Sequence, residues 1–186
     1  MVRSAEAFGL RPTKSASEIE AIIREGVAKF PKKAELYLRP MFWAESGFVD
    51  VDPDSTQFSA SVYDSPMPSP KGFSVTLSPF RKASLEFMPT DGKAACHYPN
   101  GARALREAKS RGFDNAVMLD AIGNVSELAT ANLWYAKDGE VHTPIPNGTF
   151  LNGITRQRVI ELLRRAEVRV HERAIKWQEF LDAERD

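Results

Sequence analysis

The arrangement of apolar and polar residues is typical of helices in three parts of the chain, each of which has a boundary residue or an apolar helical face. Ser15 and Glu18 have the spacing of a capping box, and the isoleucines and the phenylalanine that follow lie near one helical face. Residues 100–110 are rich in Ala, Leu, Arg and Glu and stop at Gly112, a typical C-terminal glycine. The segment that starts at Gly153 and runs through Arg165 carries apolar residues at i, i+3, i+4 and i+7, from Val159 to Ala166. We expect a helix in each part.

Strand and turn signals lie between these helices. Short β-type runs occupy residues 35–39, 73–80 and 116–119. Pro40 is expected to close the first run, in which Tyr37 and Arg39 share one face. Gly123–Asn124 and Asp138–Gly139 are two-residue hairpin signals. The pattern predicts an α+β or mixed α/β fold with a partly antiparallel sheet.

A proline-rich break divides the chain. The segment from Asp64 to Gly72 holds three prolines in five residues and lies between two β-type runs. Such segments act as semi-rigid spacers, so we expect residues 66–72 to link a small lobe, residues 1–65, to a larger one, residues 73–186. The alternative is a long surface loop inside one domain.

Composition narrows the function. With 25 basic and 25 acidic residues the formal charge is zero, which argues against binding to nucleic acid or to an anionic membrane surface. The sequence offers neither an apolar stretch long enough for a membrane helix nor a visible signal peptide. Cys96 has no disulfide partner, and the three histidines show no metal-ligand spacing. We expect a cytoplasmic, metal-free globular protein.

Three features suggest chemistry. Lys93 follows a glycine turn and could bind a carbonyl ligand as a Schiff base, although most such lysines are solvated. Glu127 has apolar, uncharged neighbours and would need a cationic or N–H partner, unless it lies on an exposed edge strand. At residues 151–156, Gly153 and Thr155 suit an anion site at a helix start, although they also suit an ordinary capped helix. Together the three match what pyridoxal phosphate needs: an amine, a carboxylate and a phosphate cradle.

Longer stretches around these residues look familiar. They are KAACHY (residues 93–98), AVMLDAIGNVSELATANL (116–133), KDGEVHTP (137–144), LNGITR (151–156) and LYLRP (36–40). In order and spacing the chain resembles the fold-type IV pyridoxal-phosphate transaminases, most closely the branched-chain amino acid aminotransferases. The resemblance implies a two-lobed D-amino-acid-aminotransferase-like fold and covers nearly the whole chain.

The resemblance also implies roles in cofactor binding. Lys93 would be the Schiff-base lysine and the proton shuttle. Glu127 would pair with the pyridine nitrogen. Tyr98 would lie near the phenolic oxygen of the cofactor, and Leu151 would pack on its ring. The expected phosphate contacts are Gly153, Ile154 and Thr155.

Substrates follow from the same resemblance. Tyr37 and Arg39 match small-domain residues that recognise substrate, the arginine being suited to a distal carboxylate. The implied reaction is amino-group exchange between branched-chain L-amino acids and 2-oxoglutarate in amino-acid biosynthesis, by a homodimer. D-amino acid aminotransferases and aminodeoxychorismate lyases share the lysine, the glutamate and the Gly-Ile-Thr element, and are the alternatives.

Compared with the family, we expect a chain truncated at both ends. The phosphate-binding arginine of the family would fall just before Met1, and a small-residue turn that binds phosphate and the substrate carboxylate would follow Asp186. Two further hypotheses therefore stand beside the enzyme. One is a non-catalytic fragment, and the other is a binding module in which Lys93 and Glu127 are surface residues.

Overall fold

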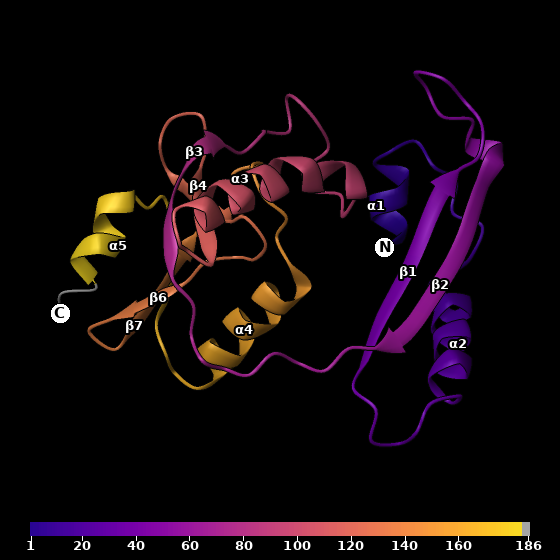
Figure 1. Cartoon of the computed structure of the whole chain (residues 1–186), viewed down its shortest axis with the longest axis horizontal. Coiled ribbons are helices and arrows are strands. Elements are labelled where there is room, and N and C mark those ends of the chain that lie inside the picture. Colours follow the sequence, from indigo (N-terminus) through magenta and orange to yellow (C-terminus); the bar gives the residue numbers. More distant parts are fainter. Residues whose placement is uncertain (184–186) are drawn as a thin grey trace. The chain divides into compact units, whose positions relative to one another are not determined.

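The computed structural model describes residues 1–183, which fall into two compact units (Figure 1). The first unit is Met1–Lys71 and the second is Gly72–Asp186. The expected linker, residues 66–72, lies at this division and has no helix or strand. The assignment of the units to a small and a large domain stays a prediction.

The first unit is a helix packed on a β-hairpin. Its elements are α1 (Val2–Glu6), α2 (Ala16–Val27), β1 (Leu36–Ala44), the 3-10 turn η1 (Pro53–Ser55) and β2 (Thr56–Asp64). Strands β1 and β2 are antiparallel, and α2 lies against both of them. The predicted capping box begins α2: the Glu18 backbone N–H donates to Ser15 Oγ at 3.3 Å, and the Ser15 N–H donates to Glu18 Oε2 at 2.8 Å.

Two boundaries in this unit were predicted wrongly. Strand β1 does not stop at Pro40 but continues to Ala44, and Pro40 pairs with Ala60 of β2. In a two-stranded sheet every strand is an edge, so a residue without an N–H can face the open side. Phe30, expected on the first helical face, lies beyond the end of α2 at Val27. Helical periodicity alone does not locate a helix end.

The second unit mixes parallel and antiparallel pairing, which confirms the predicted mixed α/β class. Its elements are β3 (Val75–Arg81), η2 (Ala95–His97), α3 (Tyr98–Ser110), β4 (Asn115–Leu119), β5 (Val125–Leu128), β6 (Tyr135–Lys137), β7 (Glu140–Pro144), α4 (Ile154–Arg165), β8 (Val170–Arg173) and α5 (Trp177–Ala183). Strand β4 pairs in parallel with β3 and antiparallel with β5. Strand β7 pairs antiparallel with β6 and in parallel with β8. Among the described helices, none has the length and apolar character that a membrane crossing demands.

Both predicted hairpins form, but the turn between β4 and β5 is longer than the expected Gly123–Asn124 pair, because β4 ends at Leu119 and β5 begins at Val125. Asp138 and Gly139 have φ angles of 52° and 77°, the left-handed pair that a two-residue turn between β6 and β7 requires. The β4–β5 turn is held by the buried carboxylate of Asp120. It accepts from the Asn124 N–H at 2.8 Å, the Asn124 side-chain amide at 2.9 Å and Asn147 Nδ2 at 3.0 Å.

Strand β4 is the centre of the core, because both of its faces are covered. Ala116 and Met118 pack with Ala104 and Ala108 of α3. The alternate residues of β4 join a second cluster, made of Val117, Leu119, Val125, Leu128 and Ile175. A strand buried on both faces carries a continuous apolar run, as the sequence of residues 116–119 does.

Close packing of α3 depends on Gly101. This glycine is buried, and a Cβ placed on it would lie 2.6 Å from the backbone oxygen of Ala129. Alanine favours a helix by about 1 kcal/mol over glycine, but the backbone contact leaves no room for it. We expect Gly101→Ala to lower the free energy of unfolding by about 1–3 kcal/mol, measured by urea denaturation. Arg106→Ala, at an exposed position of the same helix, is the control and should change stability little. An equal or increased stability of Gly101→Ala would refute this packing.

Candidate functional site

Lys93 lies in the segment that joins β3 to η2, and its side chain is exposed. Its Nζ is 5.8 Å from the centre of the Tyr98 ring at the start of α3. The segment before it is fixed at Thr90, whose hydroxyl donates to the Gly148 carbonyl at 2.6 Å. This bond joins the Lys93 segment to the loop that leads into α4.

Glu127 is not the exposed edge-strand glutamate that the sequence also allowed. It lies on β5 with only 14% of its side chain exposed, and Lys82 Nζ donates to its Oε1 at 2.6 Å. Burial raises the pKa of the Glu127 carboxyl, while the charges of Lys82 and Lys93 oppose that rise. The carboxylate therefore feels the Lys93 ammonium as well as its own ion-pair partner.

Lys82 was missed by sequence analysis. It follows directly after β3, 45 positions before Glu127, and its backbone N–H donates to the Leu119 carbonyl of β4 at 2.9 Å. The order β3-β4-β5 in the sheet brings the end of β3 and the middle of β5 to the same region. The sequence offered one indication that such a partner exists, because a glutamate in an apolar setting needs a cation. It did not indicate which cation.

Asn132 joins Glu127 to the start of α4 and was also missed. Its side-chain amide donates to Glu127 Oε2 and to the Leu151 carbonyl, both at 3.1 Å. A Cβ on Gly153 would lie 2.7 Å from the Asn132 side-chain oxygen, so a larger residue at this position would displace the Asn132 side chain. One amide thus joins two features that the sequence singled out separately, Glu127 and residues 151–156.

The start of α4 is open to a ligand. Gly153 is its N-cap residue, with no side-chain cap and no acidic residue in the first turn. Ile154 is 84% exposed, and Thr155 is exposed beside it. The free N–H groups and the positive end of the helix dipole favour an anion at such a position. Glycine is itself a common N-cap residue, so this helix start fits an ordinary capped helix as well as an anion site.

Arg156 holds the start of α4 against the neighbouring sheet. It is 2% exposed, and its guanidinium donates to the Pro144 carbonyl at 2.9 Å, Glu172 Oε2 at 3.0 Å and Asn152 Oδ1 at 2.9 Å. Pro144 ends β7 and Glu172 lies on β8. A buried guanidinium thereby fixes the first turn of α4 to the β6-β7-β8 sheet.

The expected substrate residues lie in the first unit. Tyr37 and Arg39 are exposed on β1, two positions apart as predicted, and the Tyr37 ring stacks on Tyr63 with the ring centres 5.4 Å apart. Lys93, Glu127 and the start of α4 belong to the second unit, whereas Tyr37 and Arg39 belong to the first. Their role toward the substrate stays a prediction.

Comparison with known proteins identifies the family of this chain and several relatives. The family model described as amino-transferase class IV matches residues 1–185. The probable branched-chain-amino-acid aminotransferase of Rickettsia bellii is 33% identical over 189 residues, which cover 98% of this chain and 63% of that protein. The probable branched-chain-amino-acid aminotransferase of Aquifex aeolicus is 29% identical, with coverage of 99% and 61%. The chain thus spans about three-fifths of the length of these relatives.

Solved structures agree with the predicted fold. An aminotransferase from Brucella abortus, crystallised with its cofactor PLP, is similar at a TM-score of 0.95 and 53% identity, covering 98% of this chain and 66% of that one. The branched-chain amino acid aminotransferase of Escherichia coli is similar at a TM-score of 0.87 and 26% identity, covering 95% and 59%. The two-lobed fold expected from the sequence is therefore shown, over part of its length.

The Lys82–Glu127 pair should control stability in a pH-dependent way. Burial raises the pKa of Glu127 in the folded chain above its unfolded value of 4.5, so folding favours the protonated carboxyl. This contribution to folding stability is therefore full below pH 4.5 and is lost as pH rises through the folded-state pKa. Lys82→Met removes the cation and raises that folded pKa further. We expect a loss of about 3 kcal/mol in unfolding free energy near neutral pH and a much smaller loss near pH 4, measured by urea denaturation.

The double variant Lys82→Met/Glu127→Gln is the control for this prediction. It removes both charges, so it should be more stable at neutral pH than Lys82→Met alone. A cost of Lys82→Met that is equal at both pH values, or that the second substitution does not reduce, would mean that the pair does not act as described.

Proposed function

Because the chain belongs to the class IV aminotransferases, we propose that it provides the cofactor site of a pyridoxal-phosphate-dependent branched-chain amino acid aminotransferase. The observation on which this rests is the Glu127 carboxylate, held by Lys82 and Asn132 beside the start of α4. The names of the relatives support the branched-chain substrates. A homodimer, 2-oxoglutarate as amino acceptor and a cytoplasmic location are parts of the proposal that come from the family resemblance.

The donor set fits pyridoxal phosphate. Lys93 offers a primary amine to the aldehyde, and the uncapped start of α4 offers N–H groups to the phosphate. Glu127 offers a partly buried carboxylate to the pyridine nitrogen. Leu151 and Tyr98 would contact the ring and its phenolic oxygen. When bound, the cofactor supplies an electron sink for the charge that develops at the substrate Cα.

Each protein group then has a definable task. Lys82 and Asn132 hold the Glu127 carboxylate in one orientation, so that it can share a proton with a ring nitrogen. The raised pKa of Glu127 makes it a better proton acceptor than an exposed glutamate. The Lys93 amine, once displaced by an amino-acid substrate, would move the proton at the substrate Cα. Thr155 adds a hydroxyl donor at the phosphate position.

Arg39 is proposed as the substrate contact of the first unit, with Tyr37 beside it. A guanidinium binds a distal carboxylate through paired hydrogen bonds, whereas the tyrosine ring suits an apolar side chain. Together they would let one site accept an acidic and a branched-chain substrate in turn.

Cofactor attachment tests the proposal directly. The chain, mixed with pyridoxal phosphate, should gain a visible absorbance band, and borohydride followed by peptide mapping should place the reduced label on Lys93. Lys93→Ala should reduce the label to background. Lys71→Ala, which removes an exposed lysine at the division between the units, should not change it. A label spread evenly over surface lysines would overturn the assignment.

Amino-group exchange tests the reaction class. We expect the chain to transfer the amino group of L-leucine to 2-oxoglutarate faster than that of D-alanine, with Arg39→Leu lowering kcat/KM for the dicarboxylate more than for leucine. Specific labelling at Lys93 without any exchange would leave a cofactor-binding chain that is not catalytic. Preference for the D-amino acid would favour the D-amino acid aminotransferase alternative.

A further inference from the structure

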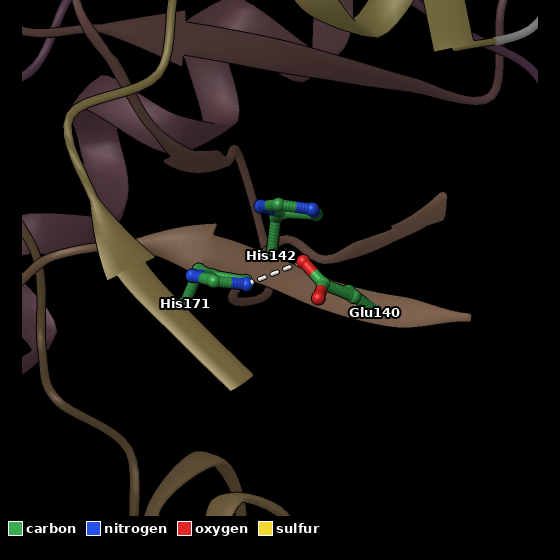
Figure 2. A group of neighbouring side chains, drawn as sticks. All are labelled: Glu140, His142 and His171. Atoms are coloured by element: carbon green, nitrogen blue, oxygen red, sulfur yellow. Dashed lines mark hydrogen bonds and ion pairs between the residues drawn. The ribbon is translucent and has the colours of Figure 1, made fainter. Parts of the chain in front are cut away.

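One cluster in the second unit takes no part in the proposed reaction. Glu140, His142 and His171 each offer one ligand atom, and these three atoms lie within 4.8 Å of one another. Figure 2 shows the two imidazole rings one above the other, with the Glu140 carboxylate beside them and hydrogen-bonded to His171. The cluster is accessible, because all three side chains are only half-buried.

The backbone brings these residues together. Glu140 and His142 are two apart on β7, so their side chains leave the same face of the sheet. His142 and His171 are direct partners in the parallel register of β7 and β8. Their ring centres are 4.7 Å apart, and the Tyr135 ring stacks on the other side of His142 at the same distance. Adjacent strands therefore hold the donors before any ligand binds.

The donor set is that of a transition-metal site. Two imidazoles and one carboxylate are ligands that Zn²⁺ prefers, and a three-ligand site of this kind leaves a fourth position for solvent. The Nε2 atom of His171 is 2.7 Å from Glu140 Oε2. That separation is shorter than the ligand spacing around a zinc ion with bonds of ~2.0–2.1 Å. The stacked rings of His142 and His171 must turn out of their parallel arrangement for each to point a nitrogen at one ion.

Two arginines lie next to the cluster, and one of them, Arg173, has partners outside it. Arg169 forms an ion pair with Glu140, but its side chain is 73% exposed, where solvent screens its charge. Arg173 donates to the Tyr135 hydroxyl at 2.6 Å and pairs with Glu179 at 2.7 Å. Its contact with His142 Nδ1 is long, 3.4 Å, and is the weakest of the three. A metal ion can displace that contact without leaving the guanidinium unpaired.

We propose that Glu140, His142 and His171 bind a divalent zinc-type metal ion that joins β7 to β8. Binding replaces the His171–Glu140 hydrogen bond by bonds from both groups to the metal, and any proton on a ligating nitrogen passes to solvent or to the other ring nitrogen, so that each ring binds as a neutral imidazole. The same sheet anchors Arg156 through Pro144 and Glu172. The ion would therefore stabilise the sheet that supports α4, whatever reaction the chain catalyses.

Calorimetric titration of the metal-free chain with Zn²⁺ tests the site. We expect saturable binding of one ion per chain, weakened at least tenfold in each of Glu140→Gln, His142→Gln and His171→Gln. The double variant Cys96→Ser/His97→Gln removes the exposed thiol and the third histidine, neither of which belongs to the cluster, and should bind as the unmodified chain does. Absence of saturable binding, or its loss only in the double variant, would overturn the proposal.

Two measurements remain decisive where a variant folds poorly. Co²⁺ added to the unmodified chain should give the visible absorption of a tetrahedral site, and Zn²⁺ should abolish it by competition. Imidazole NMR signals of His142 and His171 should shift on Zn²⁺ addition, whereas those of His97 should not. Shifts confined to His97, or no cobalt spectrum, would contradict the proposed ligands. Cofactor labelling at Lys93 is independent of both results, so failure of the metal site leaves the proposed function untouched.

Discussion

A carboxylate taken out of water organises the second unit. Glu127 cannot remain charged on a largely covered strand unless other groups replace its lost hydration. Lys82 supplies a cation at 2.6 Å, and Asn132 supplies an amide that also reaches the Leu151 carbonyl. These two contacts set the position of the strand β5 carboxylate relative to the start of α4. The proposed cofactor site depends on that relation more than on any other.

A second buried charge, Arg156, also fixes the start of α4. Arg156 fixes the first turn of α4 to the ends of β7 and β8. The contacts of this buried guanidinium hold the start of α4 in place. No side chain caps the helix, so its first N–H groups stay available to a ligand. The β6-β7-β8 sheet thus has a structural role for the site. Its own cluster of Glu140, His142 and His171 lies in the same sheet.

Local features of the fold followed from the sequence, and non-local ones did not. The Ser15 capping box and the Asp138–Gly139 turn involve residues within one turn of chain, so their chemistry is readable directly. The end of β1 was misjudged because tolerance of Pro40 depends on which side of the strand lacks a neighbour. Likewise the candidate lysine, glutamate and helix start were found by motif, but Lys82 and Asn132 were not. Their importance comes from burial of Glu127, a property of the packed sheet.

The sequence by itself determined the mixed α/β class, the positions of α2, α3 and α4 and those of both hairpins, because spacing and turn chemistry act between near neighbours. It also singled out the principal cofactor candidates by their motifs. Tertiary structure alone decided which side chains from distant parts of the chain lie together. The sheet order β3-β4-β5 pairs Lys82 with Glu127 across 45 positions. The parallel register of β7 and β8 likewise aligns His142 with His171. Pairing across a sheet is set by the whole strand arrangement, and no local spacing records it.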